Sequence, residues 1–244
     1  ARVSVTDWSA ADAFAGWIPM GPPGGSVLKR YGETNACVSV SSTDLVIKVA
    51  HANTLSVDDD VRGNGIARWV NLAEDWTATI KVSSASNNFD SLPGGAWGSI
   101  KLAVVLGGGD QTGSWFGVSA WFNDNGTDWN VTKDHKLPGE ASDVHGAAGV
   151  ALFSPGVDGN VDPNNFWLRL ECNRRGFKTS FSRDGSEPFT QLAVDEYTDP
   201  FNGSGAYPKA ALLSPKLVIM ASQSATQTTI GDVAAFHIEE IVFT

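Results

Sequence analysis

Tryptophan residues alternate with small residues in the stretch SWFGVSAWFND, which begins at position 114. On a β-strand, Trp115, Ser119 and Trp121 would point to one face of the sheet, because successive side chains point to opposite faces. Indole rings offer a large flat surface on which sugar C–H groups stack, and nearby hydroxyls bond to the sugar's hydroxyls. These three residues are therefore candidates for a glycan-binding surface.

A second alternating stretch, FWLRLEC from position 166, offers similar chemistry. Trp167, Arg169 and Glu171 share one parity, while two leucines and a cysteine share the other. We predict that the leucine face fills a core and that Trp167, Arg169 and Glu171 contact a glycan or a partner protein. The alternative is that the tryptophans of both stretches cover a second apolar layer or a subunit contact, where tryptophan is also favoured.

Oxygen donors alternate in DGNVDPNN, where Asp158, Asn160 and Asp162 form a candidate calcium site. The stretch lacks the glycine and the distal glutamate of an EF-hand loop. The alternative interpretation is turn chemistry, in which such side chains bond to nearby backbone amides. We expect no cofactor, with calcium at these three residues as the alternative. The four histidines have no paired ligand spacing, which argues against a zinc site.

Composition and charge restrict the class of protein. The chain has 244 residues and a net charge of -10, which argues against nucleic-acid binding, since that requires a basic surface. No apolar run approaches the roughly 18 to 20 residues of a membrane span, so we expect no membrane insertion. The first residues, ARVSVTDWSA, show no export signal. Cys37 and Cys172 are expected to be free buried thiols rather than a disulfide.

Short strands separated by Gly, Pro, Asn and Asp clusters dominate the chain. The predicted strands span residues 45–50, 76–83, 99–106, 114–122, 149–153, 166–172, 177–182, 217–222 and 235–243. Short helical pieces are predicted only near Val5–Phe14 and Ala67–Leu72. No change of composition divides the chain, so we predict one all-β domain over residues 1–244, a sandwich or a barrel.

A family resemblance rests on one hairpin. The strand Trp167-Leu168-Arg169-Leu170, the turn at Gly176 and the segment Phe181-Ser182-Arg183-Asp184-Gly185 resemble a hairpin of concanavalin A-like lectin/glucanase domains. The closing segment FHIEEIVFT is similar to their last strand, which often returns beside the N-terminal one. The resemblance implies a jelly-roll β-sandwich of two curved antiparallel sheets, whose concave face holds a glycan in many relatives. Similar domains occur in bacteriophage minor tail proteins.

The resemblance also implies where catalytic carboxylates would lie. In laminarinase-like enzymes of this fold they follow the spacing Glu-x-Asp-x-x-Glu on one strand, and this chain has no such motif. Asp195, Glu196 and Asp199 have the wrong spacing and are predicted to form an exposed turn. Glu239 and Glu240 are adjacent in the last strand and are predicted to face opposite ways. We therefore predict no catalytic residue.

Two hypotheses of function remain at this point. The first is a non-enzymatic, lectin-like structural or binding module of a bacteriophage virion, a minor tail or receptor-facing protein that contacts a cell-surface glycan or other virion proteins. The alternative is a secreted polysaccharide-degrading enzyme, a glycoside hydrolase or lyase, or its carbohydrate-binding accessory domain. The missing motif and the missing export signal favour the first, with a location in the virion or outside the cell.

Overall fold

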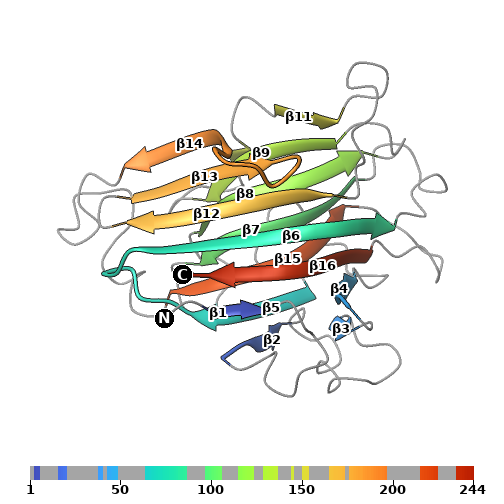
Figure 1. Ribbon diagram of the computed structural model, residues 1–244, viewed down its shortest axis with the longest axis horizontal. Helices are drawn as coiled ribbons and strands as arrows, with labels where there is room; N and C mark the ends of the chain where they lie inside the picture. The colour runs from blue at the N-terminus through green and yellow to red at the C-terminus, as the bar shows by residue number, and fades with distance from the viewer. Residues whose placement is uncertain are drawn as a thin grey trace.

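A computed structural model shows that the described part of the chain is built from strands arranged in two antiparallel sheets (Figure 1). The structure describes the following residues: 3–5, 16–20, 38–40, 43–48, 64–86, 97–105, 115–123, 129–136, 144–145, 150–153, 165–173, 176–196, 215–224 and 235–244. These residues contain no helix, and hence none that could cross a membrane.

The sheet nearer the viewer in Figure 1, here called sheet A, contains eight strands. Their order is β14-β13-β12-β6-β16-β4-β3, and β1 also pairs with β16. In chain order the bounds are β1 (Val3–Val5), β3 (Val38–Val40), β4 (Leu45–Lys48), β6 (Trp76–Ser86), β12 (Phe166–Asn173), β13 (Gly176–Ser182), β14 (Thr190–Glu196) and β16 (Ala235–Phe243).

The second sheet, sheet B, lies behind the first and also contains eight strands. Their order is β10-β9-β8-β7-β15-β5-β2, and β11 also pairs with β9. The bounds are β2 (Ile18–Met20), β5 (Asn64–Trp69), β7 (Trp97–Val105), β8 (Trp115–Asn123), β9 (Trp129–Lys136), β10 (Val144–His145), β11 (Val150–Phe153) and β15 (Lys216–Ser224). The predicted all-β sandwich of two antiparallel sheets is confirmed.

The core lies between the sheets and follows from the alternation of each strand. Along β12 every second residue is buried, and Leu168 and Leu170 are fully buried. Across the core, Phe116 of β8 stacks on Phe177 of β13, with ring centroids 5.3 Å apart. Burying each such side chain contributes about 1.5 to 3 kcal/mol, so this shared layer holds the sheets together.

The outer faces of the two sheets differ. On β12 and β6 the residues that point away from the core are part-exposed, as expected for a sheet with one solvated face. On the central strands of sheet B, by contrast, the outward residues are also buried, although several of them are polar: Ser99, Lys101, Ser119 and Thr132. The outer face of sheet B is therefore covered near its centre, unlike the outer face of sheet A.

The last strand lies beside the N-terminal one, as the family resemblance implied. Val3 pairs with Phe243 in register, and the two marked chain ends lie close together in Figure 1. The guanidinium carbon of Arg68 lies 5.4 Å from the Trp17 ring centroid and 4.5 Å from that of Phe243. Arg68 therefore joins the N-terminal region to β16 through two cation–π contacts.

Two local predictions are wrong. The segment predicted to be helical at Ala67–Leu72 is the end of β5 followed by a turn. Asp195 and Glu196 end strand β14 instead of forming a turn. Asp199 and most of the other predicted helix, Val5–Phe14, lie outside the described residues.

Irregularity in β16 overturns a third prediction. The pairing of β16 with β6 shifts register on either side of Ile238, which marks a β-bulge. Ile238 and Ile241 are both buried in the core, so Glu239 and Glu240 both lie outside it. The prediction that the two carboxylates face opposite ways fails because the extra residue resets the alternation.

Candidate functional site

A polar patch occupies the outer face of sheet B, where β7, β8 and β9 lie side by side. In one cross-strand row Lys101 pairs with Ser119, and Ser119 pairs with Thr132. The adjacent row brings together Ser99, Trp121 and Asn130. We call these six residues the sheet B patch. It combines hydroxyl, amide and ammonium groups with a part-buried indole ring, which are the groups that recognise sugars.

The other predicted tryptophan of β8 has a different environment. Trp115 is only 1% exposed and belongs to a second apolar cluster with Ala67, Ala103, Val105, Val218 and Met220. The Nζ atom of Lys101 lies 3.7 Å from the centre of its ring, a close cation–π contact. Trp115 thus lies in a second apolar layer, the alternative that the sequence left open.

Glycine at position 117 keeps β7 and β8 in close contact beside the patch. A β-carbon there would lie 2.5 Å from both the β-carbon of Ala103 and the carbonyl oxygen of Leu102. No larger residue fits without moving one of the strands. The outer face therefore has no side chain at position 117, between the ring of Trp115 and the row that contains Ser119.

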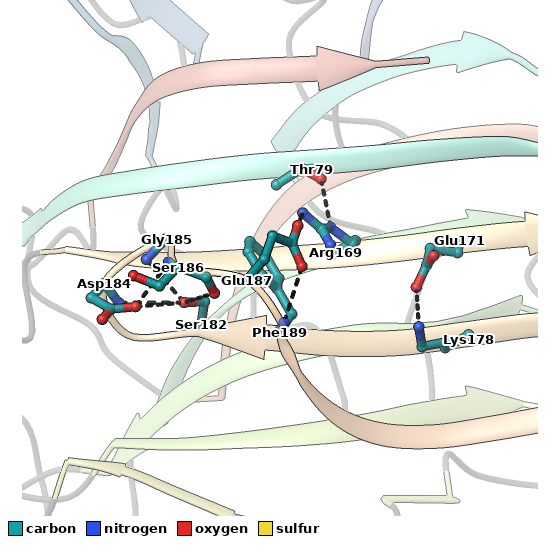
Figure 2. Close-up of polar contacts among 10 residues, drawn as sticks. All are labelled: Thr79, Arg169, Glu171, Lys178, Ser182, Asp184, Gly185, Ser186, Glu187 and Phe189. Carbon is teal, nitrogen blue, oxygen red and sulfur yellow. Dashed lines mark hydrogen bonds and ion pairs between the residues drawn. The ribbon is translucent and has the colours of Figure 1, made fainter.

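Trp167, on the outer face of sheet A, is covered by the loop that connects β13 to β14. We call residues 182–189 the 182–189 loop (Figure 2). The hydroxyl of Ser182 accepts the Gly185 N–H at 2.9 Å, and Asp184 Oδ1 accepts the Ser186 N–H at 2.9 Å. These bonds close a turn that packs against the Trp167 ring. The ring therefore supports the loop.

Arg169 holds the other half of this loop (Figure 2). Its Nε donates to Thr79 Oγ1 at 3.2 Å, and its Nη2 forms an ion pair with Glu187 Oε1 at 2.5 Å. The guanidinium carbon lies 3.5 Å from the centre of the Phe189 ring. A planar guanidinium can make all these contacts at once, which a lysine cannot. The hydrogen bond from Arg169 lowers the pKa of Glu187 below its ordinary value.

The remaining charges of this face are also paired. Lys178 Nζ lies 2.8 Å from Glu171 Oε2, in register across β12 and β13 (Figure 2). Lys81 Nζ lies 2.6 Å from Glu239 Oε2 and 5.3 Å from the Trp167 ring centroid. Trp167, Arg169 and Glu171 are therefore all engaged within the chain.

The six residues singled out from the sequence do not form one site. Trp115, Ser119 and Trp121 lie on the outer face of sheet B, whereas Trp167, Arg169 and Glu171 lie on the outer face of sheet A. The core separates the two sets, because β8 and β12 belong to different sheets whose inner faces pack together. In both strands the residues predicted to point away from the core do so. The outward residues of β8 and those of β12, however, lie on opposite sides of the sandwich.

The predicted calcium ligands, Asp158, Asn160 and Asp162, lie outside the described residues. Within the described ranges no three His, Cys, Asp or Glu side chains gather in a way that could hold a metal ion. Cys172 is a free, buried thiol, and Cys37 lies outside the described residues. Burial, with the negative charge of Asp75, raises the pKa of Cys172 to about 12.

The sequence did not single out Ser99, Lys101 or Thr132 as part of a site. A signal was present in SIKLAVV, where Ser99 and Lys101 alternate with Ile100 and Leu102. A lysine is almost never fully buried unless it has partners, so a lysine within an apolar strand marks an unusual environment.

Comparison with known proteins tests the fold. No protein-family model and no curated protein matches the chain. The catalytic domain of an endo-1,3-beta-glucanase (laminarinase) from Thermotoga petrophila RKU-1 is 13% identical, with a TM-score of 0.52 over 93% of this chain and 90% of that one. The laminarinase catalytic domain from Thermotoga maritima MSB8 is 15% identical, with a TM-score of 0.52 over 93% and 91%. The chain has the concanavalin A-like glucanase fold.

A third structure with this fold is longer. The protein named Bacteroides ovatus Xyloglucan PUL GH43B is 11% identical, with a TM-score of 0.56 over 100% of this chain. The chain spans only 38% of that protein. At such low identities these likenesses show the concanavalin A-like fold and leave the residues of the site to be argued from the chain itself.

The comparisons correct the first hypothesis of function. The prediction of a non-enzymatic bacteriophage module is wrong, because the solved structures that share the fold are named as glucanases and a xyloglucan-related glycoside hydrolase. They favour the alternative, a polysaccharide-degrading enzyme or its accessory domain. The absence of one carboxylate motif and of an export signal was too little ground for excluding an enzyme.

Proposed function

We propose that this chain works in polysaccharide degradation, as a glycoside hydrolase or as the carbohydrate-binding domain of one, and that its glycan lies on the sheet B patch. The observation that carries the proposal is the burial of polar groups around Trp121 on the outer face of sheet B. Ser99, Lys101, Ser119 and Thr132 are each at most 5% exposed there. Sequestered polar groups next to an indole ring are typical of small-molecule sites.

The outer face of sheet A is a poorer candidate. Its tryptophan is covered by the 182–189 loop, and its charged residues form ion pairs with one another. A ligand would have to break these contacts before it could bind.

Two roles follow from different observations. Similarity over nine-tenths of two laminarinase catalytic domains supports a hydrolase. Similarity to only 38% of the xyloglucan-related protein supports an accessory domain.

Both roles are tested with laminarin and xyloglucan. Binding is measured by affinity gel electrophoresis, and hydrolysis by the appearance of new reducing ends. Binding with release supports a hydrolase, and binding without release supports an accessory domain. If neither polymer is bound or cleaved, the proposed function fails for these glycans.

Variants locate the site on one face. We expect Trp121→Ala to weaken binding about tenfold, because a stacking contact contributes about 1 to 1.5 kcal/mol. Asn130→Ala should weaken it by a smaller factor. The matched control is Lys178→Gln on the outer face of sheet A, which should leave binding unchanged. Loss of binding in the Lys178 variant with none in the Trp121 variant would place the glycan on the opposite face.

A further inference from the structure

Trp69 stands out among the described residues because it is the large hydrophobic side chain left exposed, at 54%. It ends strand β5, where the Val70 N–H donates to the Pro215 carbonyl at 3.2 Å and fixes the strand end against β15. Trp69 has the same parity as Ala67, which is buried in the second apolar cluster of sheet B. Its ring is therefore held on the outer face of sheet B, at the margin of that layer.

A cation lies over this exposed ring. Lys216 pairs directly with Trp69 across β15 and β5, and its Nζ atom lies 4.5 Å from the ring centroid. Lys81 forms an ion pair with Glu239 and Lys178 with Glu171, whereas Lys216 forms none with the residues that the structure describes. In a chain of net charge -10, a part-buried lysine whose ammonium has no carboxylate partner is a local departure from the overall charge.

A similar lysine–tryptophan pair lies on sheet A, but there the lysine has a carboxylate partner and the ring is covered. Lys81 lies 5.3 Å from the Trp167 ring centroid, yet it is neutralised by Glu239. The Trp167 ring is also covered, since Gly185 packs against it. Trp69 and Lys216 have the same chemistry without the covering loop and without the counter-charge.

We propose that Trp69 and Lys216 form a subsite for an anionic saccharide unit, one that carries a carboxylate or a sulfate group. The indole would stack on the sugar ring, and the ammonium would pair with the anionic group. The subsite rests on the proposed function, because it lies on the same outer face as the sheet B patch. Three strand spacings separate β5 from β8, roughly 14 Å, so one extended glycan reaches both places.

The test compares two polymers that differ only in charge and adds a sulfated polymer with a different backbone. Wild-type protein is titrated by affinity gel electrophoresis with polygalacturonate, with carboxyl-reduced polygalacturonate, which is neutral, and with the sulfated polymer κ-carrageenan. We expect one of the two anionic polymers, or both, to bind about two- to fivefold more tightly than the neutral one, as one ion pair allows. The polymer that binds identifies the anionic group, and added salt should reduce the preference.

Three variants assign the effect to the pair. Trp69→Ala should weaken binding of the anionic polymer about tenfold. Lys216→Gln should remove the preference for the anionic polymer while leaving binding of the neutral one unchanged. Lys81→Gln is the matched control, because it removes a lysine from a tryptophan on the opposite face, and it should change neither. Since Trp69 is exposed, its loss leaves the fold intact, which a melting curve verifies.

The outcomes separate this inference from the proposed function. Binding of laminarin or xyloglucan with no preference for an anionic polymer would overturn the subsite and leave the proposed function standing. A preference that survives in the Lys216 variant would also overturn it. Failure to bind any polymer would overturn both.

Discussion

The indole ring of Trp167 lies against Gly185, at a distance where a β-carbon on Gly185 would come within 3.0 Å of ring atom Cζ2. Gly185 also has a φ of 78°, a conformation that glycine adopts at no steric cost. The Ser182 hydroxyl and the Asp184 carboxylate close the turn around it. The hairpin motif on which the family resemblance rests is therefore a packing device, in which a turn folds over a tryptophan.

Replacing Gly185 by alanine tests this device. We expect Gly185→Ala to lower the free energy of unfolding by about 1 to 2 kcal/mol, because the backbone conformation becomes strained and the new methyl group meets the ring. Urea denaturation measures the change. Gln191→Ala, at an exposed position of β14, is the control and should stay within about 0.5 kcal/mol of wild type. An unchanged stability for the Gly185 variant would contradict the contact.

The ion pair between Arg169 and Glu187 predicts a pH dependence. The hydrogen bond from Arg169 lowers the pKa of Glu187 from its ordinary 4.5 in the folded protein. A depressed carboxylate pKa contributes stability above the unfolded value, and this contribution is lost as the pH falls through the folded value. Glu187→Gln should therefore be less stable than wild type near neutral pH, and the difference should disappear as the pH falls through the lowered pKa of Glu187.

Denaturation curves at several pH values measure this difference. Asp184 has a lowered pKa as well, because the Ser186 N–H bonds to it, but both proteins carry Asp184 and its effect cancels. Glu187 is exposed, so salt should shrink the difference at neutral pH. A difference that grows on acidification would contradict the ion pair.

Alternation predicted the strands whose two faces differ most in polarity. In β12 and β16 the apolar residues stand out, and the predicted bounds differ from the observed ones by at most one residue. Strand β9, WNVTKDHK, was missed because polar residues occupy positions of both parities. Strand β5 contains Gly65, which is needed because a β-carbon there would meet the Ile219 carbonyl oxygen at 2.0 Å. Nothing local in the sequence reveals such a close approach between strands.

Parity also cannot tell which sheet a strand joins. Trp121 and Trp167 both point away from the core, so the alternating pattern gives both the same interpretation, a contact surface. The pairing of β8 with β7 and of β12 with β6 puts them on opposite sides of the sandwich. This assignment depends on contacts between strands far apart in the chain, which a local pattern does not contain.

Cys172 should be chemically inert while the protein is folded. Its pKa is raised to about 12, so at pH 8 only about one thiol in 10,000 is ionised, against roughly a quarter in an unfolded chain. In a Cys37→Ser variant, reaction with a thiol reagent should be about 1,000-fold slower in native buffer than in guanidinium. Reaction is followed by absorbance. Rapid labelling of the native variant would contradict the burial of this thiol.

Trp115 provides the clearest contrast between a structural and a binding tryptophan. It is 1% exposed, and its ring N–H is buried without a hydrogen-bond acceptor. Trp115→Ala should cost about 3 to 5 kcal/mol of unfolding free energy, as large-to-small core changes do. Trp115→Phe should cost about 1.5 kcal/mol or less, because phenylalanine keeps most of the ring and removes an unpaired donor. Trp121→Ala, at a part-buried position, should destabilise less than Trp115→Ala and weaken glycan binding more. Thermal melts and binding assays on the same three variants measure both effects, and equal stability losses at the two positions would contradict the distinction.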